Sequence, residues 1–142
     1  MGPEDAIDHI QNYRRLIDRQ GDVALENTIA ELLHEGVIQK HLRKSLREYK
    51  RRRDFFCQAM QDQLGDKVSF KIPEGGLAIW AGFDKSIHLP RLAAQARTEG
   101  LAFSDGQSQS LLANPQFTRL GFASSSFDEL EKSVSIISRI LK

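Results

Sequence analysis

Arg119 is the residue of this 142-residue sequence best suited to bind a charged ligand. It lies in the segment 117–123, Phe-Thr-Arg-Leu-Gly-Phe-Ala, whose pattern predicts a β-strand. Leu120 and Phe122 fall on one face of that strand, so Arg119 falls on the other face. A planar guanidinium fixed on a strand suits bidentate binding of a carboxylate. Spacing alone, however, favours an ordinary surface salt bridge.

A second candidate is the turn Pro73-Glu74-Gly75-Gly76, which separates two predicted strands. Paired glycines carry no side chains, so the backbone at Gly75 and Gly76 can approach a ligand closely. An ordinary hairpin turn is the simpler interpretation.

The segment 39–53 is strongly basic, with eight Lys or Arg residues against the single acid Glu48. A basic helix can bind phosphates. No aromatic interleaving or nucleic-acid motif accompanies it, so a solvated helix face is the favoured interpretation. The net charge of the whole chain is only +1 and gives no global attraction to nucleic acid.

The remaining reactive side chains indicate neither a catalytic centre nor a metal site. Cys57 is the only cysteine, which excludes an internal disulfide and favours a structural thiol in a cytosolic protein. The four histidines lack metal-ligand spacing. Phosphate-binding glycine loops and Gly-x-Ser-x-Gly elbows are absent from the sequence. No apolar run approaches the roughly 18 residues of a membrane-spanning helix, and the first residues do not resemble a signal peptide.

The elements that must hold these residues follow from periodicity. Apolar spacing predicts three helices with one buried face each, two strands, a helix, a short strand, a further strand and a final helix that begins at Ser126. The helices are predicted at residues 3–18, 22–36, 37–64 and 90–100 and from Ser126 onward. The strands are predicted at residues 68–72, 77–83, 101–103 and 117–123. Hydrophobic residues make up 40% of the chain, enough for one folded core. We therefore expect an α/β (α+β) two-layer sandwich, with a small mixed or antiparallel sheet and helices on one face.

Read together, the motifs resemble the C-terminal part of class I/II (fold-type I) aminotransferases. Within them, they resemble in particular the aminotransferase-like domain of MocR-type regulators of the GntR superfamily. The resemblance rests on the order and spacing of Gly21-Asp22, Glu26, Gly36, His41-Leu42-Arg43-Lys44, Tyr49, Arg52-Arg53-Asp54, Pro73-x-Gly75-Gly76-Leu77 and Arg119-Leu120-Gly121-Phe122-Ala123.

The resemblance implies a role for each part of the chain. Residues 1–24 would be an interdomain helix or the tail of a large domain, and residues 25–142 the small C-terminal domain. Arg119 would bind the substrate α-carboxylate, and Gly75 and Gly76 would lie at the mouth of the cleft. The family's cofactor is pyridoxal 5′-phosphate, but its Schiff-base lysine and phosphate cup would lie upstream of this chain. We therefore expect no catalytic, cofactor-binding or metal-binding residue here.

The resemblance also implies partners and a context. The chain would be a fragment of a cytoplasmic, homodimeric regulator that binds an amino acid, binds DNA through a winged helix outside this chain, and has no membrane segment. Two alternatives stay open. The chain could be the same domain of a true amino-acid aminotransferase, or a free-standing interaction module that uses the basic helix 40–53.

Overall fold

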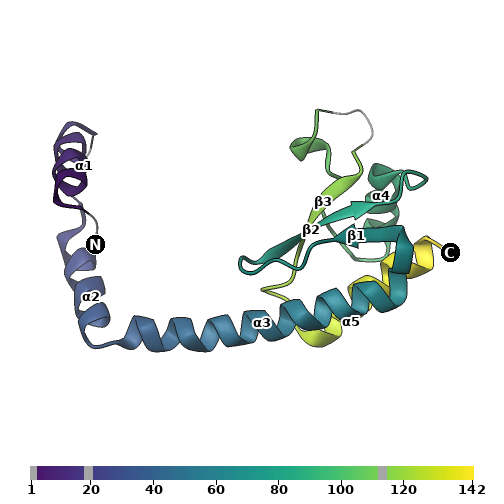
Figure 1. Ribbon diagram of the computed structural model, residues 1–142, viewed down its shortest axis with the longest axis horizontal. Coiled ribbons are helices and arrows are strands. Elements are labelled where there is room, and N and C mark those ends of the chain that lie inside the picture. The colour runs from purple at the N-terminus through teal and green to yellow at the C-terminus, as the bar shows by residue number, and fades with distance from the viewer. Residues whose placement is uncertain (1–2, 18–20, 112–114) are drawn as a thin grey trace. The chain divides into compact units, whose positions relative to one another are not determined.

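The computed structural model describes residues 3–17, 21–111 and 115–142 (Figure 1). The chain divides into two compact units, Met1–Lys44 and Ser45–Lys142. Within the described ranges, no helix combines the length and the apolarity needed to cross a lipid bilayer.

The first unit contains helices α1, Glu4–Ile17, and α2, Val23–His34, and the start of α3, which spans Val37–Leu64. Asp22 caps α2 by accepting a hydrogen bond of 3.0 Å from the Leu25 amide, as the sequence predicts. Gly36 follows α2 with φ of 74°, a conformation that favours glycine and ends the helix.

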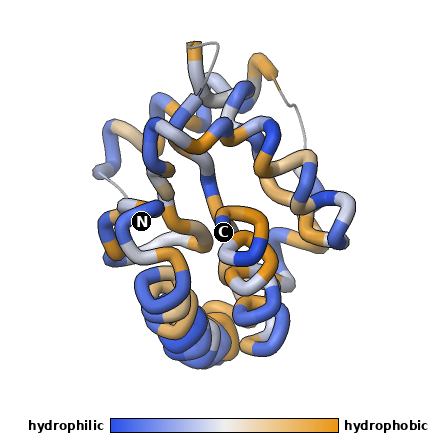
Figure 2. The backbone as a smooth tube through the Cα atoms, turned by 90° about the vertical axis from the view of Figure 1, so that its right-hand side faces the viewer, coloured by the Kyte–Doolittle hydropathy of each residue, from blue (hydrophilic) through white to orange (hydrophobic). Residues whose placement is uncertain are grey.

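The predicted buried face of α2 is not buried within the described chain. Periodicity predicts that Leu25, Ile29, Leu32 and Leu33 face a core. Leu32 is only partly buried, the other three are exposed, and α2 has no buried residue. Figure 2 shows that hydrophobic and hydrophilic residues are interspersed along the chain. The apolar residues of α2 keep helical spacing, but the described residues of the first unit leave this face exposed.

The second unit contains the antiparallel sheet and the helices that cover it. The strands pair in the order β1-β2-β3. The elements from Ser45 onward are the rest of α3, the short 3-10 helix η1 (Gly65–Lys67), β1 (Val68–Phe70), β2 (Ala78–Phe83), α4 (Leu89–Thr98), the 3-10 helix η2 (Gln107–Gln109), β3 (Phe117–Gly121) and α5 (Phe127–Ile140).

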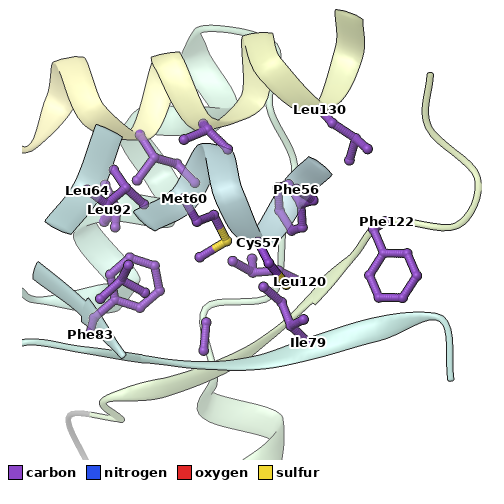
Figure 3. Close-up of a cluster of buried hydrophobic side chains, with 14 of the residues drawn as sticks. Phe56, Cys57, Met60, Leu64, Ile79, Phe83, Leu92, Leu120, Phe122 and Leu130 are labelled. Atoms are coloured by element: carbon purple, nitrogen blue, oxygen red, sulfur yellow. The ribbon is translucent and has the colours of Figure 1, made fainter. Parts of the chain in front are cut away.

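The core lies between one face of the sheet and the helices α3, α4 and α5 (Figure 3). The side chains that meet there are Phe56, Cys57, Met60 and Leu64 of α3, Leu92 of α4, Leu130 of α5, Ile79 and Phe83 of β2, Leu120 of β3 and the following Phe122. Gln63 of α3 accepts hydrogen bonds from Ser135 and Ser138 of α5, so these two helices lie side by side. This arrangement confirms the predicted two-layer α+β fold.

The structure agrees with the expected cap of the last helix and differs from the expected short strand before it. Ser126 forms a capping box with Glu129 at the start of α5, as predicted. The short strand expected at residues 101–103 is wrong, because this segment has no strand partner among the described residues. The amide of Leu101 instead donates to the carbonyl of Ala96 and closes the end of α4.

Candidate functional site

The candidate site is the sheet face that the helices leave open, and Arg119 lies on it. Along β3, Phe117, Arg119 and Gly121 are exposed, whereas Thr118 and Leu120 are buried. This alternation follows from the strand period, since Leu120 must reach the core. The predicted orientation of Arg119 is therefore confirmed, while its chemical role remains a prediction.

An aromatic pair lies on the same open face. The antiparallel register places Trp80 of β2 opposite Arg119, and Gly82 opposite Phe117. A Cβ at Gly82 would come within 2.5 Å of the Phe117 ring, so the absence of a side chain there lets the ring lie over the strand. The rings of Trp80 and Phe117 are parallel, with centroids 6.3 Å apart. Trp80 is 49% exposed.

Trp80 is a site residue that sequence reasoning missed. Periodicity places it correctly in a strand, but only the register between two strands identifies it as the neighbour of Arg119. The signal available in the sequence was a tryptophan in an otherwise apolar strand.

The glycine turn lies at the end of the sheet where Gly121 ends β3. The amide of Phe122 donates to the carbonyl of Leu77 over 3.1 Å, and Ala78 pairs with Gly121. The predicted cleft loop, Gly75 and Gly76, therefore lies at the end of the sheet where β3, the strand that carries Arg119, finishes.

This face can bind an anion next to an apolar surface. A guanidinium binds a carboxylate through two parallel hydrogen bonds, and the aromatic pair offers flat contact area beside it. Across the described ranges, no three His, Cys, Asp or Glu side chains gather in a way that could hold a metal ion. The residues described on this face also form no phosphate-binding glycine loop, so they do not fit pyridoxal phosphate as its main binding residues.

Cys57 does not belong to this face. It is 3% exposed and lies in the core. Burial raises the pKa of the Cys57 thiol, against a smaller lowering effect of the Arg53 guanidinium. The thiol is therefore protonated at neutral pH and serves packing, in agreement with the structural role predicted for it.

The basic segment 39–53 is engaged in part with the domain itself. Arg51 pairs with Glu48, and its guanidinium lies 5.5 Å from the centre of the Phe127 ring. Arg52 donates to Glu48 and to the carbonyl of Ala123, and Arg53 donates to Asp54 and to the carbonyl of Pro73. These contacts favour an intramolecular role for the last two arginines over phosphate binding.

No model of a known protein family matches the chain. Two curated relatives match nearly all of it, both of them HTH-type transcriptional regulators of Bacillus subtilis described as uncharacterized. YdfD is 25% identical over 144 residues, which cover 100% of this chain and 29% of the relative. YisV is 26% identical over 138 residues, which cover 94% of this chain and 27% of the relative.

Solved aminotransferase structures share the fold. The multiple substrate aminotransferase of Thermococcus profundus superposes with a TM-score of 0.81 at 19% identity, over 96% of this chain and 34% of that one. LysN is an α-aminoadipate aminotransferase of Thermus thermophilus, solved in complex with N-(5′-phosphopyridoxyl)-L-leucine. It superposes with a TM-score of 0.77 at 19% identity, over 99% of this chain and 36% of that one.

The chain therefore has the fold of the small C-terminal domain of fold-type I aminotransferase-like proteins. Its curated homologues YdfD and YisV are HTH-type transcriptional regulators, and the chain spans less than a third of the length of either.

Proposed function

We propose that this chain acts as the small domain of a pyridoxal-phosphate-dependent, aminotransferase-like transcriptional regulator of MocR type. In this proposal Arg119 binds the α-carboxylate of an amino acid, and the open sheet face closes over the cofactor cleft. The turn at Gly75 and Gly76 borders the cleft, and residues 1–24 connect to the large domain. The observation that carries the proposal is the exposed position of Arg119 on a strand whose opposite face is anchored in the core.

The matches to regulators support the regulatory part of the proposal. Both HTH-type relatives align over 94% or more of this chain, well beyond the strand that carries Arg119. Pyridoxal phosphate, held by a large domain, would supply the aldehyde that reacts with the ligand's amine. The residues of this chain would contribute binding and orientation: Arg119 fixes one end of the amino acid so that its amine is held in one place.

The test uses the full-length, cofactor-loaded protein and two probes that differ by one group. Leucine, the amino-acid part of the adduct in the LysN structure, is compared with 3-methylbutylamine, which has the same side chain without the carboxylate. We expect Arg119→Ala to weaken leucine binding roughly a hundredfold, because charge-assisted hydrogen bonds are lost, and to leave the amine unaffected. Binding is measured by the absorption change of the cofactor.

Arg119→Lys serves as the matched variant for this experiment. It keeps the positive charge but cannot form the two parallel hydrogen bonds, so leucine affinity should fall between those of the parent and Arg119→Ala. Equal leucine affinity in the parent and in Arg119→Ala would refute the carboxylate role.

A true amino-acid aminotransferase is the second candidate, favoured by the TM-scores to two solved aminotransferases. Turnover separates the two functions. A regulator should bind the amino acid and change its affinity for promoter DNA, whereas an aminotransferase should transfer the amino group to a 2-oxo acid with multiple turnovers.

The third candidate is an interaction module that uses the basic helix 40–53. A gel shift with nonspecific DNA tests it, because phosphate binding that survives physiological salt would support such a module. The contacts of Arg52 and Arg53 with backbone carbonyls of the same domain argue against it.

A further inference from the structure

Two neighbouring arginines of α3 reach the two segments that form the candidate site. The side chain of Arg52 is 24% exposed and that of Arg53 only 15%. Nη1 of Arg53 donates to the carbonyl of Pro73, the first residue of the glycine turn, over 2.8 Å. Nη1 of Arg52 donates to the carbonyl of Ala123, two residues beyond the end of β3.

Each of these guanidinium groups is itself held in place. Nε of Arg52 donates to Glu48 Oε1 over 3.3 Å. Nε and Nη2 of Arg53 donate to Asp54 Oδ1 over 2.8 and 2.6 Å. A guanidinium with several fixed donors loses little further freedom when it binds one more acceptor, so both contacts with backbone carbonyls are pre-organised.

A third hydrogen bond joins the two segments to each other. The amide of Phe122 donates to the carbonyl of Leu77 over 3.1 Å. Three hydrogen bonds therefore connect the segments in a ring: Arg53 holds the turn, Leu77 after the turn holds Phe122, and Arg52 holds Ala123. A shift of the turn away from α3 would break the hydrogen bond from Arg53, and a shift of the end of β3 would break the one from Arg52.

We infer that Arg52 and Arg53 are positioning residues, which fix the Arg119 strand and the glycine turn relative to each other on α3. The inference deepens the proposed function and rests on it, since Arg119 must bind the carboxylate for its placement to matter. The orientation of a binding group matters at small distances: a misplacement of about 1 Å can cost up to roughly a hundredfold in a positioned reaction.

The first part of the test measures local opening in the 142-residue chain and needs no cofactor. Arg52→Ala and Arg53→Ala should each speed amide hydrogen exchange at Phe122 about tenfold, the effect expected for one lost charge-assisted hydrogen bond. Arg51→Ala is the matched control, because its side chain is 72% exposed and its described contacts are with Glu48 and Phe127. It should leave this exchange unchanged.

The second part measures ligand discrimination in the full-length, cofactor-loaded protein. Arg52→Ala and Arg53→Ala should weaken leucine binding about tenfold with no effect on 3-methylbutylamine, and the lysine variants should recover part of the loss. Each alanine variant combined with Arg119→Ala should add little further loss, since the two changes act on one interaction.

The outcomes separate the inference from the proposed function. Unchanged exchange at Phe122, or an equal loss for leucine and for the amine, would overturn the positioning role. If Arg119→Ala leaves the preference for leucine unchanged, the proposed function fails, and the positioning role that rests on it fails too. If Arg119→Ala removes that preference while the Arg52 and Arg53 variants keep it, only the positioning role fails.

Discussion

Gly75 and Gly76 stand next to each other in the turn, but the domain requires glycine at only one of the two positions. Gly76 has φ of 90°, a conformation that L side chains rarely adopt. Gly75 has an ordinary φ, and a Cβ built on it would meet no described atom of this chain within 4 Å. The fold therefore explains Gly76, whereas an approaching ligand or domain would explain Gly75.

We predict that the two alanine substitutions affect different properties. Gly76→Ala should lower the free energy of unfolding by about 1–2 kcal/mol through backbone strain, and Gly75→Ala should change it by less than about 0.5 kcal/mol. In the full-length protein, Gly75→Ala should instead weaken leucine binding, because the turn borders the cleft in our proposal. Urea unfolding and ligand titration measure the two effects. Full ligand affinity in Gly75→Ala would contradict a cleft-side position for this turn.

At the scale of elements, α5 depends on the capping box of Ser126 and Glu129. Hydrogen bonds from Ser126, chiefly from its backbone amide, hold the pKa of the Glu129 carboxyl below its ordinary value. A group whose pKa is lowered by folding stabilises the native state above its unfolded pKa, about 4.3 for Glu, and loses this effect as pH falls through the folded value.

Ser126→Ala should therefore lower the free energy of unfolding by about 1 kcal/mol at neutral pH. The difference from the parent should change only slightly below about pH 4, because Ser126→Ala keeps the backbone amide that is the main donor to Glu129, so protonation of Glu129 weakens the cap in both proteins. Thermal unfolding of both proteins between about pH 3 and pH 7 checks this. Ser133→Ala is a suitable control, since Ser133 lies inside the same helix and donates to the carbonyl of Leu130.

The elements were predictable from sequence where local signals act alone. The range of α3, the caps at Asp22 and Ser126, and the exposed position of Arg119 follow from periodicity and side-chain chemistry within a few residues. The pairing of Trp80 with Arg119 and the contacts of Arg52 and Arg53 do not. They join residues that lie far apart in the chain or depend on strand register, which periodicity does not specify.

At the scale of the molecule, helical periodicity correctly gave the apolar face of α2 but not what covers it. Leu25, Ile29 and Leu33 lie on this face and are exposed. Contiguous exposed apolar surface favours association with another surface. We therefore expect the isolated chain to bind a hydrophobic dye and to associate at high concentration.

Replacing Leu25, Ile29 and Leu33 together by Gln should reduce both dye fluorescence and association. Because none of the three is buried, the melting temperature of the Ser45–Lys142 unit should not fall. Leu130→Gln is the contrasting variant, since Leu130 is 2% exposed and its loss should lower that temperature strongly. Dye titration measures the exposed apolar surface, and sedimentation velocity measures self-association. If the triple variant associates as strongly as the parent, another surface is responsible for the association.

The strand order has a consequence for how copies of this chain can meet. In the described sheet β2 is central, so β1 and β3 each carry an outer edge. Open edges favour fibril-like addition of further strands, but β1 has three residues and β3 five, so each edge offers an added strand few main-chain partners. Aggregates that the domain forms in storage should therefore be amorphous and bind a hydrophobic dye, and they should not be ordered cross-β fibrils.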